Sequence, residues 1–114
     1  MEKIVASGLL YDFYGELLTE HQKRIFEDFV YHDLSLAEIA AEHGISRQGA
    51  HDVIRRCDAT LQKYEDKLGL VGRFMRMREM VEELRRLAGE YDGDIDALTK
   101  RVNAVTDEIL KELL

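Results

Sequence analysis

The sequence has 114 residues, of which 46% are hydrophobic and 34% are charged, and it contains no proline. This length and apolar content predict one folded domain, with room for an appendage, and exclude a disordered chain. The formal net charge of -7 excludes a general nucleic-acid binder unless positive charge is concentrated locally, because phosphates repel a negative surface. The lack of proline and the many Leu, Ala, Glu, Lys and Arg residues predict an all-α fold.

Few residues of the sequence indicate the cellular compartment. Cys57 is the only cysteine, so it cannot close a disulfide within the chain, and a reducing cytosol is expected. The first apolar stretch contains Asp12 and Glu16, so it resembles neither a signal peptide nor a membrane span. We therefore expect a cytoplasmic protein without membrane insertion.

The first 44 residues contain three predicted helices. Apolar residues between 4 and 18 recur at helical spacing and predict a first helix. Thr19 with Gln22, and Ser35 with Glu38, are capping-box pairs, in which two side chains satisfy unpaired N–H groups at a helix start. They predict a second helix that ends near residue 33 and a short third helix that ends at Gly44.

Residues 36–57 have the pattern of a helix-turn-helix. The tripeptide 44–46 links the third helix to a fourth, which begins at Arg47 and continues to Leu68 before Gly69. Small Ala40 suits the close approach of two helices. Polar residues face away from the apolar side of the fourth helix, namely Arg47, Gln48, His51, Asp52 and Arg55.

These polar residues have a functional and a neutral interpretation. Arg and Gln side chains can bind guanine and adenine edges, whereas the same residues also suit a merely solvated helix face. Asp52 counts against DNA, because phosphates repel a carboxylate, although it could accept a hydrogen bond from cytosine. Residues 35–57 have no net charge, so this face is mixed rather than strongly basic.

The last 42 residues have their own periodicity. Apolar residues recur at spacings of three and four before and after the segment 91–94, which predicts a C-terminal helical hairpin. We therefore expect a helix-turn-helix domain over residues 1–72 and amphipathic helices over 73–114 that serve association. Five residues should be largely buried, in part between two copies of the chain: Met80, Leu84, Leu98, Val102 and Val105.

A second small basic patch lies in this region. Residues 73–88 have a net charge of +2, with basic side chains at Arg73, Arg76, Arg78, Arg85 and Arg86. They could contact phosphates, but pairing with Glu79, Glu82 and Glu83 on the same helix is the favoured interpretation.

Sites for catalysis, metals or cofactors are not predicted. The four histidines lack the His-Glu-x-x-His spacing of a zinc protease and are expected at the surface. Cys57 lies on an apolar helix face without a neighbouring base, and no glycine-rich phosphate loop occurs. We expect a non-enzymatic protein without a cofactor.

Three stretches, Leu17–Gln22, Asp33–Ala40 and Gly44–Gln48, resemble region four of bacterial sigma factors, which reads promoter DNA through a helix-turn-helix. Together with Leu10–Tyr14 and Tyr64–Leu70, they resemble the YlxM family of small proteins regarded as DNA-binding. The resemblance implies a sigma region four-like bundle and contacts to duplex DNA from Ser46, Arg47, Gln48, His51 and Arg55. Ala50 and His51 depart from the family pattern, which has a larger aliphatic residue and an aromatic there.

The family resemblance also implies a link to the signal recognition particle pathway, through gene neighbourhood. Our main hypothesis is a homodimeric helix-turn-helix regulator of transcription. The alternative is a module of the protein-targeting machinery that binds protein through the same fold, and RNA is a third possible partner.

Overall fold

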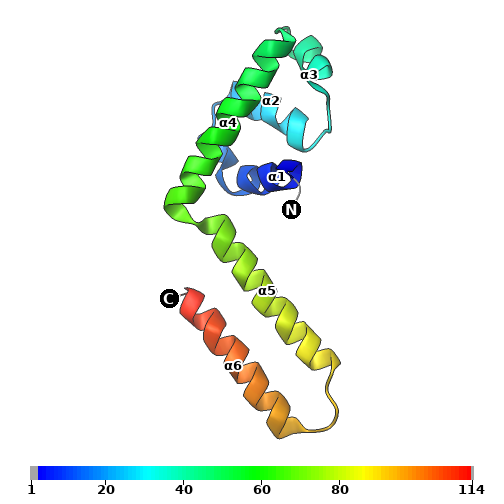
Figure 1. Cartoon of the computed structure of the whole chain (residues 1–114), viewed down its shortest axis with the longest axis vertical. Coiled ribbons are helices and arrows are strands. Elements are labelled where there is room, and N and C mark those ends of the chain that lie inside the picture. Colours follow the sequence, from blue (N-terminus) through cyan, green and yellow to red (C-terminus); the bar gives the residue numbers. More distant parts are fainter. Residues whose placement is uncertain (1–2, 114) are drawn as a thin grey trace. The chain divides into compact units, whose positions relative to one another are not determined.

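The structure, a computed structural model, describes residues 3–113 (Figure 1). These residues are all-helical, as the sequence predicts, and contain no strand. The elements in chain order are α1 (Lys3–Tyr14), a 3-10 turn η1 (Gly15–Leu17), α2 (Glu20–Val30), α3 (Leu36–His43), α4 (Arg47–Leu68), α5 (Leu70–Gly89) and α6 (Ile95–Leu113). They form two compact units, one that ends at Val71 and one that begins at Gly72.

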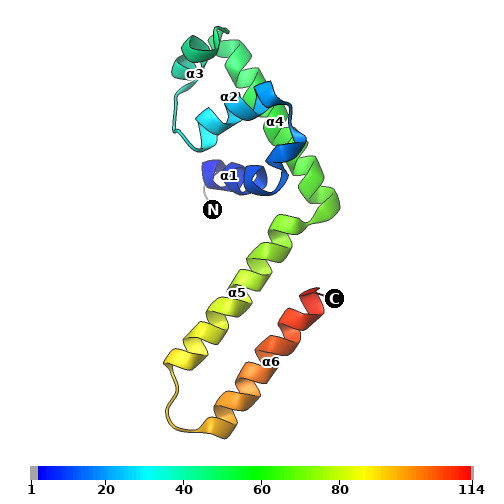
Figure 2. The same cartoon turned by 180° about the vertical axis from the view of Figure 1, so that it is seen from behind.

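The first unit is a small bundle in which α1, α2 and α3 all lie against the long helix α4, as both views show (Figures 1 and 2). Both predicted capping boxes form. The Thr19 hydroxyl accepts the Gln22 N–H at 3.2 Å, and the Ser35 hydroxyl accepts the Glu38 N–H at 3.1 Å. Local hydrogen bonds therefore set where α2 and α3 begin.

The core of this unit is formed by one face of each helix. Its fully buried side chains come from α1, α2, α3 and α4, and they are Tyr14, Ile25, Phe26, Ile39, Ala50, Cys57 and Leu61. Cys57 is thus a small core residue, as predicted. Ala40 is 8% exposed where α3 meets α4, and its small side chain allows the two helices to approach closely.

The first helix is shorter than the apolar pattern predicts. It ends at Tyr14, and residues 15–17 tighten into a 3-10 turn. A Cβ atom at Gly15 would lie 2.7 Å from the Tyr11 ring, so only glycine fits this turn without displacing that side chain. The apolar residues Leu17 and Leu18 therefore follow the helix instead of extending it, and Leu18 still enters the core.

The second unit is the predicted hairpin, in which α5 and α6 run antiparallel. The Asp94 carboxylate accepts the Ala97 N–H at 3.1 Å and so caps α6 as expected. Within the single chain, the five predicted seam residues are half-buried rather than largely buried, and Leu87 is the one buried side chain among the described residues of this unit. Two helices offer each apolar seam only one neighbour, which explains this partial burial.

In residues 3–113, no helix combines the length and the hydropathy that a membrane crossing requires.

Candidate nucleic-acid interface

The start of α4 is fixed by Ser46, which has extended backbone angles and accepts the Gly49 N–H on its hydroxyl at 2.9 Å. Gly44 precedes it in the left-handed conformation, with φ of 65°, which allows a tight turn between α3 and α4. This turn sets the direction in which α4 leaves α3. The first four N–H groups of a helix have no partner within the helix, and the Ser46 side chain satisfies one of them, so it contributes to helix stability.

The first three turns of α4 have one buried and one exposed face. Ala50, Ile54 and Cys57 face the core. The five predicted contact residues are all exposed: Ser46, Arg47, Gln48, His51 and Arg55. Because residues four apart lie on the same side of a helix, Arg47, His51 and Arg55 form one row, and Gln48 lies beside it. The structure therefore brings the predicted residues together on one accessible surface.

Asp52 holds the Gln48 side chain and adds a negative charge to this exposed surface of α4. Its Oδ1 accepts the Gln48 side-chain N–H at 3.0 Å, and it lies 3.8 Å from Nδ1 of His51. This hydrogen bond occupies one of the two N–H donors of Gln48 and restrains the side chain, so contact with a base edge must either fit this hydrogen bond or break it. The negative charge of Asp52 also lies beside the row, so it opposes a phosphate at the same place.

A shallow hollow of about 380 Å³ lies next to the row. It is lined by Leu36 at the start of α3 and by Arg47, Gln48 and His51 on α4. Leu36 is not among the contact residues that the sequence predicts. The apolar periodicity of α3 does not show that Leu36 lines a hollow beside α4, because this placement depends on the angle between the two helices.

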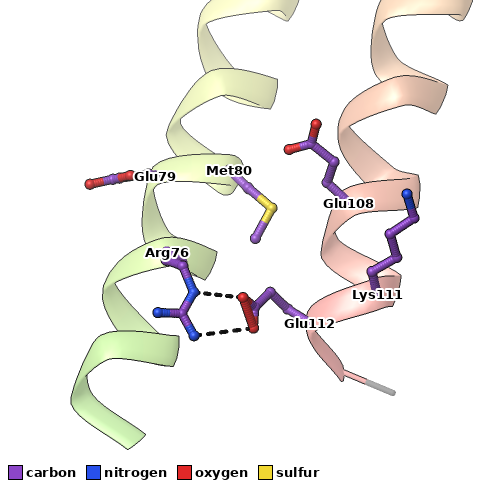
Figure 3. A pocket seen from close by; sticks show the side chains of 6 residues that line it. All are labelled: Arg76, Glu79, Met80, Glu108, Lys111 and Glu112. Carbon is purple, nitrogen blue, oxygen red and sulfur yellow. Dashed lines mark hydrogen bonds and ion pairs between the residues drawn. The ribbon is translucent and has the colours of Figure 1, made fainter. Parts of the chain in front are cut away.

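The second basic patch is partly neutralised by acids. Arg86 pairs with Glu83 on its own helix, as predicted, and also with Glu90 directly after the helix. Arg76 instead reaches α6, where its Nε lies 2.6 Å from Glu112 (Figure 3). That pair borders a groove of about 390 Å³ into which Met80 points. These pairs favour a role for the patch in the hairpin itself.

One expectation about the histidines is wrong. His43 is not a surface residue; its side chain is 16% exposed, and its Nε2 lies 2.6 Å from Oδ2 of buried Asp28. His32 contacts the other oxygen of Asp28 through Nδ1, at 2.8 Å. Burial alone would raise the pKa of Asp28, but the hydrogen bonds from His32 and His43 lower it. Asp28 and His43 are 15 positions apart, so no local spacing in the sequence could reveal this contact.

Comparison with known proteins gives one consistent result. Residues 1–102 match the family model described as "Putative helix-turn-helix protein, YlxM / p13 like", also called UPF0122. The UPF0122 protein of Symbiobacterium thermophilum is 42% identical over 92 residues, which are 81% of this chain and 86% of that protein. A UPF0122 protein of Desulforamulus reducens is 36% identical over 113 residues, 98% of this chain and 97% of its own length. The relative from Geobacillus kaustophilus is 38% identical over 106 residues, which are 90% of this chain and 96% of that protein.

Proposed function

This chain belongs to the YlxM/p13-like helix-turn-helix family, and from that membership we propose that it is a non-enzymatic, cytoplasmic regulator of transcription that binds duplex DNA. The observation that carries the proposal is the exposed row Arg47, His51 and Arg55, with Gln48 beside it, on a helix whose opposite face is buried. The backbone of this helix is already folded before binding, so it can present these side chains to a major groove without a further ordering of the backbone.

Each residue has a distinct role in this proposal. Arg47 and Arg55 bind phosphates or guanine edges, because guanidinium groups donate paired hydrogen bonds. Gln48 leaves Asp52 and binds adenine, and His51 and the Ser46 N-cap lie close enough to contact the backbone of the same half-site. With two arginines in the row, affinity is modest and strongly dependent on salt.

We also propose that the chain acts as a homodimer joined through the hairpin of the second unit. A two-helix unit of about 40 residues rarely holds together alone, and here Leu87 is the only buried side chain among its described residues. The charges of the two helices are complementary, since residues 73–88 have a net charge of +2 and residues 89–114 one of -4. An antiparallel arrangement of two hairpins would place α5 of one copy against α6 of the other.

The alternative candidate is a protein-binding or RNA-binding module of the targeting machinery, including components of the signal recognition particle pathway. The acidic segments 1–34 and 89–114, each with a net charge of -4, favour a basic protein partner over a nucleic acid. In this case the row on α4 would be a solvated surface without a function in base recognition.

Fluorescence anisotropy with promoter fragments and random duplexes at low salt tests the proposal. We expect the wild-type chain to prefer some promoter fragments, and the Arg47→Ala/Arg55→Ala variant to lose most of this binding. The matched control is Arg24→Ala/Lys63→Ala, which removes the same charge from exposed positions outside both the row and the hairpin. If the wild type does not bind, or if both double variants bind equally well, the row does not recognise DNA and the protein-binding alternative replaces it.

A further inference from the structure

Three potential metal ligands meet at the contact between α2 and α3. Asp28 lies on α2, and Glu42 and His43 lie at the end of α3. One ligand atom from each residue lies within 4.8 Å of the other two. Since Asp28 is distant from the other two in sequence, only the folded chain brings these groups together.

The three potential ligands differ in how deeply they are buried. Asp28 is 8% exposed, His43 is half-buried and Glu42 is exposed. An ion from solvent could therefore reach the site beside Glu42 and contact Asp28 and His43 on its inner side. Hydrogen bonds to His32 and His43 already restrain the buried carboxylate of Asp28. Asp28 therefore loses little side-chain freedom when it binds an ion, which favours binding.

We propose that Asp28, Glu42 and His43 form a binding site for a divalent transition-metal ion, of which Zn²⁺ is the best fit. Zn²⁺ commonly takes three protein ligands of the imidazole and carboxylate types and keeps a water molecule in the fourth position. An imidazole ligand disfavours Mg²⁺ and Ca²⁺, which prefer oxygen. The ligand atoms of a tetrahedral zinc site lie roughly 3.3 Å apart, so rotation of the exposed Glu42 side chain and a small opening of the Asp28–His43 contact would suffice.

Metal binding would replace one proton. A carboxylate only accepts hydrogen bonds, so Nε2–H of His43 donates to Oδ2 of Asp28 at 2.6 Å in the metal-free chain. The metal would take the place of that proton on Nε2, and the proton would move to Nδ1 of the same ring, so that the imidazole binds the metal as a neutral ligand.

His32 has a supporting position. Its Nδ1 donates to Oδ1 of Asp28 at 2.8 Å, so it can orient the carboxylate while the other oxygen binds the metal. His32 is thus a positioning residue rather than a ligand in this proposal. A bound ion would join α2 to α3 directly before the Gly44 turn that leads to α4.

Isothermal titration calorimetry of the full chain at pH 7.5 with ZnCl₂, and in parallel with MgCl₂, tests the site. We expect one Zn²⁺ per chain, an increase in the melting temperature with Zn²⁺, and neither effect with Mg²⁺. Glu42→Gln should weaken binding at least tenfold, and it leaves the Asp28–His43 contact intact, so its fold is not at risk. His43→Gln should abolish binding, while His21→Gln, at an exposed histidine outside the site, should bind as the wild type does.

A second readout identifies the ligands. Co²⁺ in the same site should give the intense visible absorption of tetrahedral coordination, and this absorption should be lost in Glu42→Gln. The proposal is overturned if Zn²⁺ does not bind, if Mg²⁺ produces the same stabilisation, or if Glu42→Gln and His43→Gln bind Zn²⁺ as well as His21→Gln does. None of these outcomes depends on DNA binding, so the two proposals fail or succeed separately.

Discussion

The Tyr14 hydroxyl at the end of α1 donates a hydrogen bond of 2.5 Å to Oε1 of Glu65 in the last turn of α4. The same pair satisfies the start of α5, because the Leu70 N–H donates to the Tyr14 oxygen at 3.0 Å and the Val71 N–H donates to Glu65 at 2.9 Å. Burial of the Tyr14 hydroxyl is the largest cause that raises its pKa, and the hydrogen bond to Glu65 is the second largest. Two side chains that are 51 positions apart thus replace a local cap at the junction of α4 and α5.

Tyr14→Phe should therefore lower the free energy of unfolding by about 1 to 3 kcal/mol, because the Glu65 carboxylate loses one of its hydrogen-bond donors and the Leu70 N–H loses its acceptor. Urea unfolding followed by circular dichroism measures this loss. The control is Tyr91→Phe, at an exposed tyrosine of the second unit. Equal stability of the two variants would show that the Tyr14–Glu65 contact contributes little.

Asp52→Ala should strengthen the binding of duplex DNA. The substitution removes a negative charge beside the arginine row and frees Gln48, and a unit charge at about 4 Å contributes roughly 1 kcal/mol in water. We therefore expect an increase in affinity of severalfold at low salt, measured by fluorescence anisotropy. Glu108→Ala, at an exposed acid on α6, is the control for net charge alone. A similar increase in both variants would indicate a general electrostatic effect rather than a local one.

The salt dependence of DNA binding should reflect the small number of basic residues. If each chain contacts roughly three phosphates, through Arg47 and Arg55 of the row and through the exposed Arg56 that follows Arg55, a dimer contacts about six, and the slope of log affinity against log salt is about -5. Arg47→Ala should make this slope less negative. Gln48→Ala should change the sequence preference and leave the slope unchanged. A slope near zero would contradict binding through phosphates.

Association through the hairpin predicts a dimer at micromolar concentration in sedimentation experiments. Leu84→Asp and Val102→Asp should each shift the chain toward the monomer, because a charge in an apolar contact loses its hydration. Thr99→Asp adds the same charge at an exposed position of α6 and should leave the dimer intact. A wild-type chain that sediments as a stable monomer contradicts the proposed dimer.

The burial of Cys57 predicts a loss of stability at alkaline pH. Burial, with a smaller effect from Asp58, raises the pKa of the Cys57 thiol to about 11. An unfolded thiol ionises near pH 8.5, so the unfolded chain loses its proton first as the pH rises. The free energy of unfolding should fall between these two values, by at most about 1.4 kcal/mol per pH unit from this group.

Urea titrations at pH 8, 9 and 9.5 measure this slope, and Cys57→Ala should reduce it. The thiol should also react with a disulfide reagent only as fast as the chain unfolds. Rapid reaction of the folded chain at pH 8 would contradict the burial of Cys57.

The sequence by itself determined the local elements. Capping pairs such as Thr19 with Gln22, the turn at Gly44 and the polar face of α4 depend on residues three or four positions apart, and such short spacings determine helix starts and helix faces directly. For the same reason, the predicted contact residues from Ser46 to Arg55 are exposed together on one helix.

Only the tertiary structure decided the contacts between helices. Tyr14 with Glu65, and Asp28 with His43, are distant in sequence, and their meeting depends on how α1, α2 and α3 pack on α4. The end of α1 at Tyr14 was likewise decided by the packing of Gly15 against the Tyr11 ring. Helical periodicity specifies which face of each helix is apolar, but it does not specify the angle or register between two helices, and these set every contact between residues on different helices.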